Sequence, residues 1–262
     1  MITKRLYRLI HFEKDGRKLH RIYIKDKKKG NISPWHDINL LAYNEKDLFP
    51  AVVTLSRYNI AHFEMNPQLE FNPLEQVQVT NPITGKLENQ FFRQFPNFNY
   101  AFLPQTWNDP TKQDIKYSEY TGDGQPIGVI DLGDTYMPIG HTLGYRIIGG
   151  FCMCVHGRFA SWKMLGIPHQ SPFHDKVKNL KEYEQEYPGK IDAIVQWFER
   201  ASALQGDNPA FKEGPIEERE FALKMLEDGY KGWKKLKLPE YKANFNYWMR
   251  EEVISTALVL RR

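Results

Sequence analysis

Two different hydrophobic patterns divide the chain. From Arg21 to about Ile167, short runs rich in β-branched and aromatic residues alternate with Gly, Pro, Asn and Asp, as in AVVTLSRY, GVIDLGD and GYRIIGGFCMCVHG. Such runs predict strands. After Ser171 the apolar residues recur at spacings of three and four, which predicts amphipathic helices. These residues are Ile191, Ile194, Val195, Phe198 and Ala201 in one helix, and Ala222, Met225, Leu226, Tyr230 and Trp233 in another. The pattern therefore predicts an α+β, mainly β fold in which an antiparallel barrel is flanked by late helices.

Turn-forming residues mark the loops and the end of the core. The stretches 66–82 and 205–215 are rich in Pro, Asn and Gly, which predicts loops inside one domain. Residues 236–245 separate this core from a C-terminal extension, in which Tyr247, Trp248 and Met249 form a bulky apolar cluster. Such a cluster is typical of an intramolecular anchor and also of the centre of a protein interface. We expect three parts: a basic N-terminal extension over 1–18, a core domain over 19–238, and a C-terminal extension over 239–262.

The first 30 residues carry most of the imbalance of charge. They contain eleven Lys or Arg against three acidic residues, a net charge of +8, whereas the whole chain carries +4 and the remainder therefore −4. Apolar residues flank Lys14-Asp15-Gly16, and an Asp-Gly turn between such runs predicts a β-hairpin.

Three roles stay open for this basic arm. The first is an ordinary strand pair, whose lysines are solvated on the surface. The second is a mitochondrial targeting segment, because the first nine residues contain three basic residues and no acid. Contact with nucleic acid or anionic lipid is the third role, for which the arm has no readout motif.

The most informative motif is TGDGQPIGVIDLGD at Thr121–Asp134. It resembles the signature G-D-x-D-P-x-D of soluble (family I) inorganic pyrophosphatases of the eukaryotic type, in which three aspartates hold magnesium. The resemblance covers about residues 19–238 and is most specific at five ordered islands: PWHDINL (34–40), NYAFLPQTWNDP (99–110), SWK (161–163), YPGKIDAIVQWF (187–198) and FALKMLEDGYKGWKKL (221–236). It implies the five-stranded, oligonucleotide-binding-like (OB-like) antiparallel barrel of the pyrophosphatase fold, with flanking helices.

Only part of the family's functional set is matched. The residual family positions are Glu64, Tyr100, Asp123 and Lys163. The resemblance implies substrate contacts for Tyr100 and Lys163, and a metal contact for Asp123. Four metal-binding acids of the family are lost, and their positions hold Gln125, Gly128, His156 and Ser161. At five further family positions a glutamate becomes Thr54, a lysine His62, an arginine Glu88, an acid Phe159 and a tyrosine Ala201.

These losses bear directly on the chemistry that the resemblance implies. Magnesium takes oxygen ligands in near-octahedral geometry, and several ions beside a polyanion need several carboxylates. Each metal contributes on the order of several kcal/mol of charge stabilisation in the transition state. Because about 1.4 kcal/mol corresponds to a tenfold change in rate, loss of the metal cluster would slow the reaction by many powers of ten. We therefore expect a catalytically inactive pseudo-pyrophosphatase with no cofactor. A divergent magnesium-dependent diphosphatase is the alternative, with a rearranged site that uses Asp131, Asp134 or Asp192.

Other candidate chemistry is weaker. Cys152, Cys154 and His156 alternate along a predicted strand and would share one face, but a fourth zinc ligand is missing and buried cysteines are ordinary core residues. The segment HQSPFH (169–174) lacks a nucleophile elbow, and the glycines of 144–150 lack the ending of a phosphate-binding loop. We assign these last two segments no function.

Composition and length agree with a folded domain. The 262 residues, 41% of them hydrophobic, suffice to bury one core. The longest apolar run, Val253–Leu260, is shorter than the ~20 residues that cross a bilayer. Two cysteines give no secretory disulfide framework, so we expect a mitochondrial location, or otherwise a cytoplasmic one.

Three functions from different classes follow. The first is a non-catalytic subunit that docks with other proteins of a large, mitochondrial assembly through its N- and C-terminal extensions. The second is the divergent diphosphatase. The third is a module that binds phosphate or nucleic acid through Lys163, Tyr100 and the basic arm.

Overall fold

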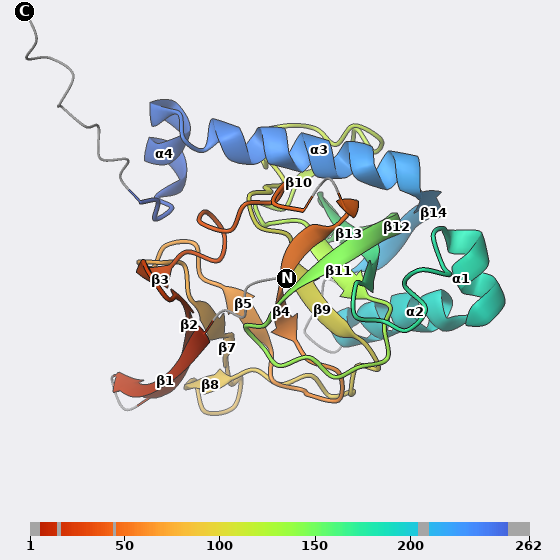
Figure 1. Ribbon diagram of the computed structural model, residues 1–262. Coiled ribbons are helices and arrows are strands. Elements are labelled where there is room, and N and C mark those ends of the chain that lie inside the picture. Colours follow the sequence, from red (N-terminus) through yellow and green to blue (C-terminus); the bar gives the residue numbers. More distant parts are fainter. Residues whose placement is uncertain (1–5, 15–16, 44–45, 204–209, 251–262) are drawn as a thin grey trace, which may run out of the picture.

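A closed ring of five strands forms the centre of the protein (Figure 1), whose computed structural model describes residues 6–14, 17–43, 46–203 and 210–250. Around the ring the hydrogen-bonded order is β13-β11-β9-β4-β12, and β12 pairs back with β13 to close it. The predicted mainly β barrel is confirmed, with the difference that β11 and β13 run parallel. The strands of the ring are β4 (Phe49–Leu55), β9 (Asn99–Phe102), β11 (Gly128–Asp131), β12 (Thr142–Val155) and β13 (Phe159–Pro168).

Strand β12 also carries β14 (Phe211–Glu218) along its outer edge. A Cβ at Gly149 would lie 2.8 Å from the carbonyl oxygen of Glu217, so glycine permits the close approach of these two strands. The expectation of a loop over 205–215 was therefore wrong for 211–215. Gly214, at φ +64°, and Pro215 lie in an irregular stretch of the β12–β14 ladder, so these turn-forming residues mark a bulge inside a strand.

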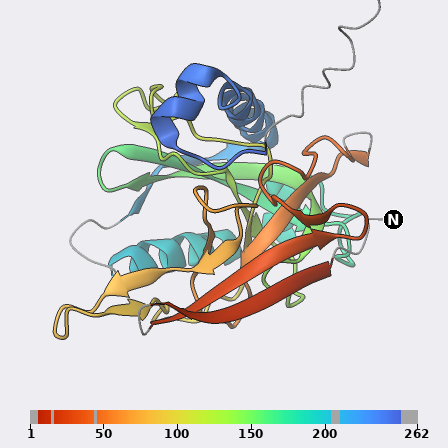
Figure 2. The same ribbon diagram turned by 90° about the vertical axis from the view of Figure 1, so that its left-hand side faces the viewer.

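A second sheet lies beside the ring, with the order β1-β2-β6-β5 and β3 paired to β2. The predicted hairpin is confirmed, because β1 pairs with β2 from Leu6↔Lys25 to Lys14↔Arg17; its Asp15-Gly16 turn lies outside the described residues. In Figure 2 the hairpin lies at the side of the molecule opposite α3. The strands are β1 (Leu6–Lys14), β2 (Arg17–Asp26), β3 (Gly30–Ile32), β5 (Phe63–Met65) and β6 (Leu74–Gln76).

Three short strands complete the β structure: β7 (Gln78–Thr80) and β8 (Leu87–Asn89), which form a small hairpin, and β10 (Thr121–Gly122), which adds to β13. The expectation of a loop over 66–82 was therefore wrong for 74–76 and 78–80, which form β6 and β7. The proposed boundary between residues 18 and 19 stays a prediction, although both residues belong to β2.

Both predicted helices are confirmed, as α2 (Lys190–Ala203) and α3 (Arg219–Lys235). Two more helices were not predicted, α1 (Leu180–Glu186) and α4 (Pro239–Phe245). Helix α1 is capped at its N-terminus by Asn179, whose side-chain oxygen accepts the backbone N–H of Glu182 at 2.9 Å. Both missed helices have seven residues, which is too short for a clear helical period. No helix within the described ranges is long and apolar enough to span a membrane.

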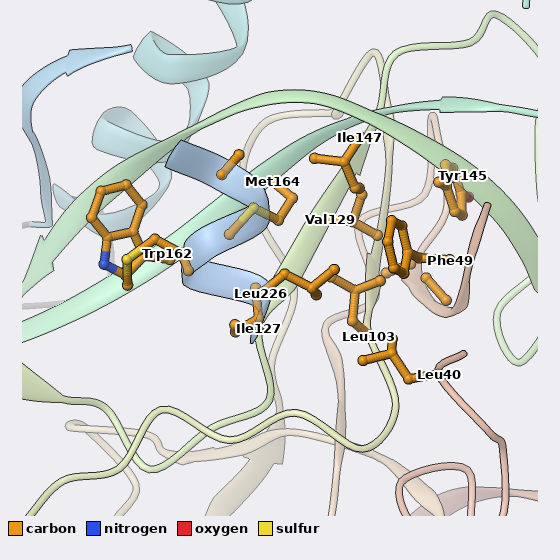
Figure 3. Close-up of a cluster of buried hydrophobic side chains, with 14 of the residues drawn as sticks. Leu40, Phe49, Leu103, Ile127, Val129, Tyr145, Ile147, Trp162, Met164 and Leu226 are labelled. Atoms are coloured by element: carbon orange, nitrogen blue, oxygen red, sulfur yellow. The ribbon is translucent and has the colours of Figure 1, made fainter. Parts of the chain in front are cut away.

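Helix α3 closes one end of the ring through an apolar core (Figure 3), in which Leu226 of the helix lies among Ile127, Leu103 and Met164 of the barrel. Glycines bring the helix close. A Cβ at Gly232 would lie 2.6 Å from the carbonyl oxygen of Trp107. The helix therefore packs directly on the backbone that leads into the Thr121–Asp134 segment.

The C-terminal extension returns to the body as far as residue 250. The Trp248 backbone N–H donates to Pro67 O at 2.8 Å, and the Tyr247 ring packs edge-on against Trp35. Arg250 forms an ion pair with Asp37 at 3.2 Å. Of the two roles open for the apolar cluster 247–249, the structure shows the intramolecular anchor. Residues 251–262, which include the apolar run 253–260, lie outside the described residues.

Candidate functional site

A cavity of about 190 Å³ lies between the barrel and α2. Strands β4, β5, β9, β12 and β13 and helix α2 all contribute to its wall. The fold thus gathers candidate residues that are far apart in the sequence. Those that line the cavity are Thr54, His62, Glu64, Tyr100, Lys163 and Ala201.

Lys163 is linked to Asp123 through Ser161. The Lys163 ammonium donates to Ser161 Oγ at 2.8 Å, and Ser161 Oγ donates to Asp123 Oδ2 at 2.5 Å. Desolvation acts to lower the pKa of Lys163, but Tyr100, Asp123 and Glu64 together raise it above its ordinary value. The ammonium therefore stays charged. It is the local counter-charge of two carboxylates that, by the resemblance, belong to the family's metal and phosphate site.

Both oxygens of Asp123 are already occupied by the protein. Besides Ser161 at Oδ2, Oδ1 accepts Asn108 Nδ2 at 3.1 Å and the Gln125 backbone N–H at 3.0 Å. Desolvation raises the pKa of Asp123, and the opposing effects of Lys163 and these hydrogen bonds do not cancel it. A carboxylate with three protein donors has few lone pairs left for a hard cation.

The glycine-led frame of this loop has a structural cause of its own. A Cβ at Gly122 would lie 2.5 Å from the backbone carbon of Asn108 and 2.7 Å from the carbonyl oxygen of Asp109. Only glycine allows this contact between the two segments. The sequence frame of the motif is thus explained by packing, independently of any ligand at Asp123.

Glu64 is paired with His62 at the mouth of the cavity. Glu64 Oε1 lies 3.0 Å from His62 Nε2, and the Glu64 side chain is 59% exposed. Desolvation acts to raise the pKa of Glu64, but the hydrogen bond and charge of His62, together with Lys163, hold that pKa below its ordinary value. His62 Nδ1 contacts Gln90 Oε1 at 3.0 Å, so the imidazole is held between these two partners.

Tyr100 fills the space where a side chain at position 128 would project. A Cβ at Gly128 would lie 1.9 Å from the Tyr100 hydroxyl oxygen and 2.5 Å from Cζ. The Tyr100 ring is fixed by Phe198, which packs edge-on with centroids 5.7 Å apart, and by the Lys163 ammonium 5.4 Å from its centroid. Position 128 therefore offers no ligand atom for a metal, and any side chain there would have to displace Tyr100.

Three other candidate positions lie away from the cavity wall. Gln125 is exposed in the loop. His156 is exposed in the turn after β12, at φ +54°. Glu88 is exposed on β8, where its carboxylate accepts Asn81 Nδ2 at 3.0 Å. The structure thus separates His156 and Glu88 from the group around Lys163.

The three acids of the predicted rearranged site do not gather either. Asp131 is buried and accepts hydrogen bonds from Asn99 Nδ2 at 3.0 Å and Tyr145 Oη at 3.2 Å. Asp134 forms ion pairs with Arg57 and Lys190. Asp192 is exposed in the first turn of α2. The three carboxylates therefore do not form a common metal site.

The magnesium cluster that the resemblance implies does not fit these residues. Across residues 6–14, 17–43, 46–203 and 210–250, no three His, Cys, Asp or Glu side chains are placed so that they could hold a metal ion. Near the cavity, the two candidate carboxylates are Asp123, bound by three donors, and Glu64, paired with His62. These two carboxylates therefore belong to a cluster of polar groups whose charges are already compensated by the protein.

The structure also does not place the three candidate zinc ligands on one face of a strand. Cys152 and Cys154 are buried on β12, as expected for core residues, but His156 follows the end of the strand and does not share their face. Burial raises the pKa of the Cys152 thiol far above its ordinary value. These cysteines are packing residues.

Sequence reasoning missed the apolar half of the cavity. Phe92, Met153, Val155 and Trp197 line it together with Phe198, and the Phe92 and Trp197 rings pack edge-on with centroids 5.1 Å apart. Trp197 and Phe198 lie in one of the islands of resemblance, where only Phe198 was assigned to the apolar face of the predicted helix. The signal that could have found this half was the replacement of a family glutamate by Thr54 and of a family tyrosine by Ala201 on the same wall.

The chain belongs to the inorganic pyrophosphatase family, because the family model described as "Inorganic pyrophosphatase" matches residues 52–234. It is 31% identical over 220 residues to "Inorganic pyrophosphatase 1" of Caenorhabditis elegans, covering 83% of this chain and 50% of that protein. It is 29% identical over 222 residues to "Inorganic pyrophosphatase" of Homo sapiens, covering 83% of this chain and 74% of that one.

Solved structures agree on the fold. The type I inorganic pyrophosphatase of Toxoplasma gondii superposes with a TM-score of 0.76 at 24% identity, covering 88% of this chain and all of that one. This likeness confirms the pyrophosphatase fold. The chain spans half the length of the C. elegans relative, and its own activity is a separate question from its family.

Proposed function

We propose that this member of the inorganic pyrophosphatase family does not hydrolyse pyrophosphate and acts instead as a structural subunit, through its surface. The observation that carries the proposal is the state of Asp123, the one matched aspartate of the signature, whose two oxygens accept three protein hydrogen bonds and whose counter-charge is Lys163. Hydrolysis of a polyanion by hard cations needs free carboxylates at this place.

Electrostatics around the cavity support the same proposal. An entering pyrophosphate would meet the carboxylate of Glu64 on the cavity wall, and the carboxylate of Asp123 is linked to the Lys163 ammonium through Ser161. The one ammonium on the wall, Lys163, already interacts with both. Without metal ions, like-charge repulsion works against binding of the polyanion.

A second candidate function is slow, magnesium-dependent diphosphatase activity. It is favoured by the names of the relatives and by the meeting of Glu64, Tyr100 and Lys163 in one cavity. It requires Asp123 to release Ser161 and Asn108, and further ligands to come from outside the group that the structure brings together.

The two functions are separated by phosphate release from pyrophosphate with added magnesium, measured beside the human relative as positive control. We expect the purified chain to release no phosphate above the background of magnesium and pyrophosphate alone. Magnesium-dependent release that is abolished in Asp123→Ala would establish the diphosphatase instead.

The role as a subunit rests on the surface rather than the cavity. The basic hairpin β1–β2 lies at the edge of the second sheet, and residues 239–250 cover part of the body. A partner would therefore contact the outside of these segments. Membership of a mitochondrial assembly is part of the proposal, and native size-exclusion chromatography tests it, because a subunit elutes with its partners and a free protein does not.

A further inference from the structure

The apolar half of the cavity points to a ligand of a different kind from pyrophosphate. We propose that the cavity binds an uncharged molecule with one aromatic ring system and one polar substituent, of the phenol or indole class. The proposal rests on the proposed function only in that metal-bound pyrophosphate does not occupy the cavity.

Aromatic and aliphatic side chains make one continuous wall. Trp197 lies edge-on to Phe92 and to Phe198, with centroids 5.1 and 5.3 Å apart. Met153 and Val155 of β12 line the same cavity, and a flat ring packs well against such edges and faces. At Ala201 the side chain ends at Cβ, so the wall recedes at that point of α2.

The size of the cavity fits a single ring system. An apolar cavity of about 150 Å³ accepts benzene, and this cavity has about 190 Å³. The difference leaves room for a second fused ring or a short substituent. A chain-like lipid or a nucleotide is larger than this volume.

Charge compensation selects against ions. The Lys163 ammonium is balanced by Asp123 through Ser161, and the Glu64 carboxylate contacts His62 at 3.0 Å. A ligand with a full charge would disturb one of these pairs. The Tyr100 hydroxyl can donate or accept a hydrogen bond, and the Lys163 ammonium can donate one, to a neutral polar group at the edge of the ring.

Calorimetric titration with phenol, indole and pyrophosphate tests the proposal on the full chain. We expect saturable binding of phenol and indole and none of pyrophosphate. Ala201→Phe fills the recess and is expected to weaken indole binding at least tenfold. Val79→Phe adds the same ring to an exposed site on β7 and is expected to leave binding unchanged.

A second variant keeps the test decisive should Ala201→Phe fail to fold. Tyr100→Phe removes one hydroxyl and is expected to weaken phenol binding about three- to tenfold, while benzene binds as before. The proposal is overturned if phenol and indole do not saturate, or if folded Ala201→Phe binds indole like the original chain. Phosphate release measured separately distinguishes this failure from failure of the proposed function.

Discussion

Replacement of Trp107 by alanine is expected to lower the free energy of unfolding by about 3–5 kcal/mol. Trp107 is 1% exposed, and its ring packs edge-on against Phe245 and Tyr247, with centroids 5.0 and 6.4 Å apart. Its indole N–H donates to the Gly124 carbonyl at 3.1 Å. One side chain thus joins the Thr121–Asp134 segment to the C-terminal extension, and its loss leaves a large void between them.

Trp107→Phe is the matched control. It keeps an aromatic ring and removes the hydrogen bond to Gly124. We therefore expect the free energy of unfolding to fall less than in the alanine variant, by an amount nearer to the value of one hydrogen bond, about 1 kcal/mol. Urea denaturation measures both. A loss below 1 kcal/mol in the alanine variant would show that the extension does not depend on this contact.

The second large effect is expected at Gly128. Gly128→Asp should lower the free energy of unfolding by about 2–4 kcal/mol, because the new side chain displaces the Tyr100 ring and brings a carboxylate into a buried strand. Such a variant restores an acid of the family's signature, yet we expect it to gain no magnesium binding by itself.

Gly128→Ala separates the two causes. It adds the same Cβ without the charge, so we expect the overpacking cost alone, about 1–3 kcal/mol. The difference between the two variants then reports the buried carboxylate. Both variants are compared by thermal and urea denaturation, and an aspartate variant as stable as the original chain would mean that Tyr100 moves away without cost.

A fourfold variant with acids at 125, 128, 156 and 161 would restore all four lost ligand positions of the family. Position 161 lies beside Asp123, and position 128 faces Tyr100. Position 156 lies in an exposed turn. Raised magnesium affinity in the fourfold variant therefore requires Tyr100 to leave its place and the turn after β12 to rearrange.

Much of the fold could be predicted because it follows from local pattern. The buried runs of β4, β11 and β12, and the helical periods of α2 and α3, are long and regular. The short helices α1 and α4 could not be predicted from periodicity, and β14 was hidden because Gly214 and Pro215 are also turn residues. At β14, pairing with β12 decided the structure.

The candidate site was predicted in part for the same reason. The family motifs located Glu64, Tyr100 and Lys163, which the fold brings to one cavity. They could not show that Ser161 would bridge Asp123 to Lys163, since this depends on side-chain geometry between β13 and the loop after β10. Nor could they show that aromatic residues distant in sequence would complete the wall.

The central claim is that this pyrophosphatase fold no longer gathers divalent cations around a polyphosphate. Titration with Mn²⁺, a paramagnetic substitute for magnesium that accepts the same oxygen ligands, measures this directly through the spin-resonance signal of the free ion. With pyrophosphate present, we predict no loss of signal beyond that caused by pyrophosphate alone. Saturable uptake of several ions per chain, lost in Asp123→Ala, would contradict the claim.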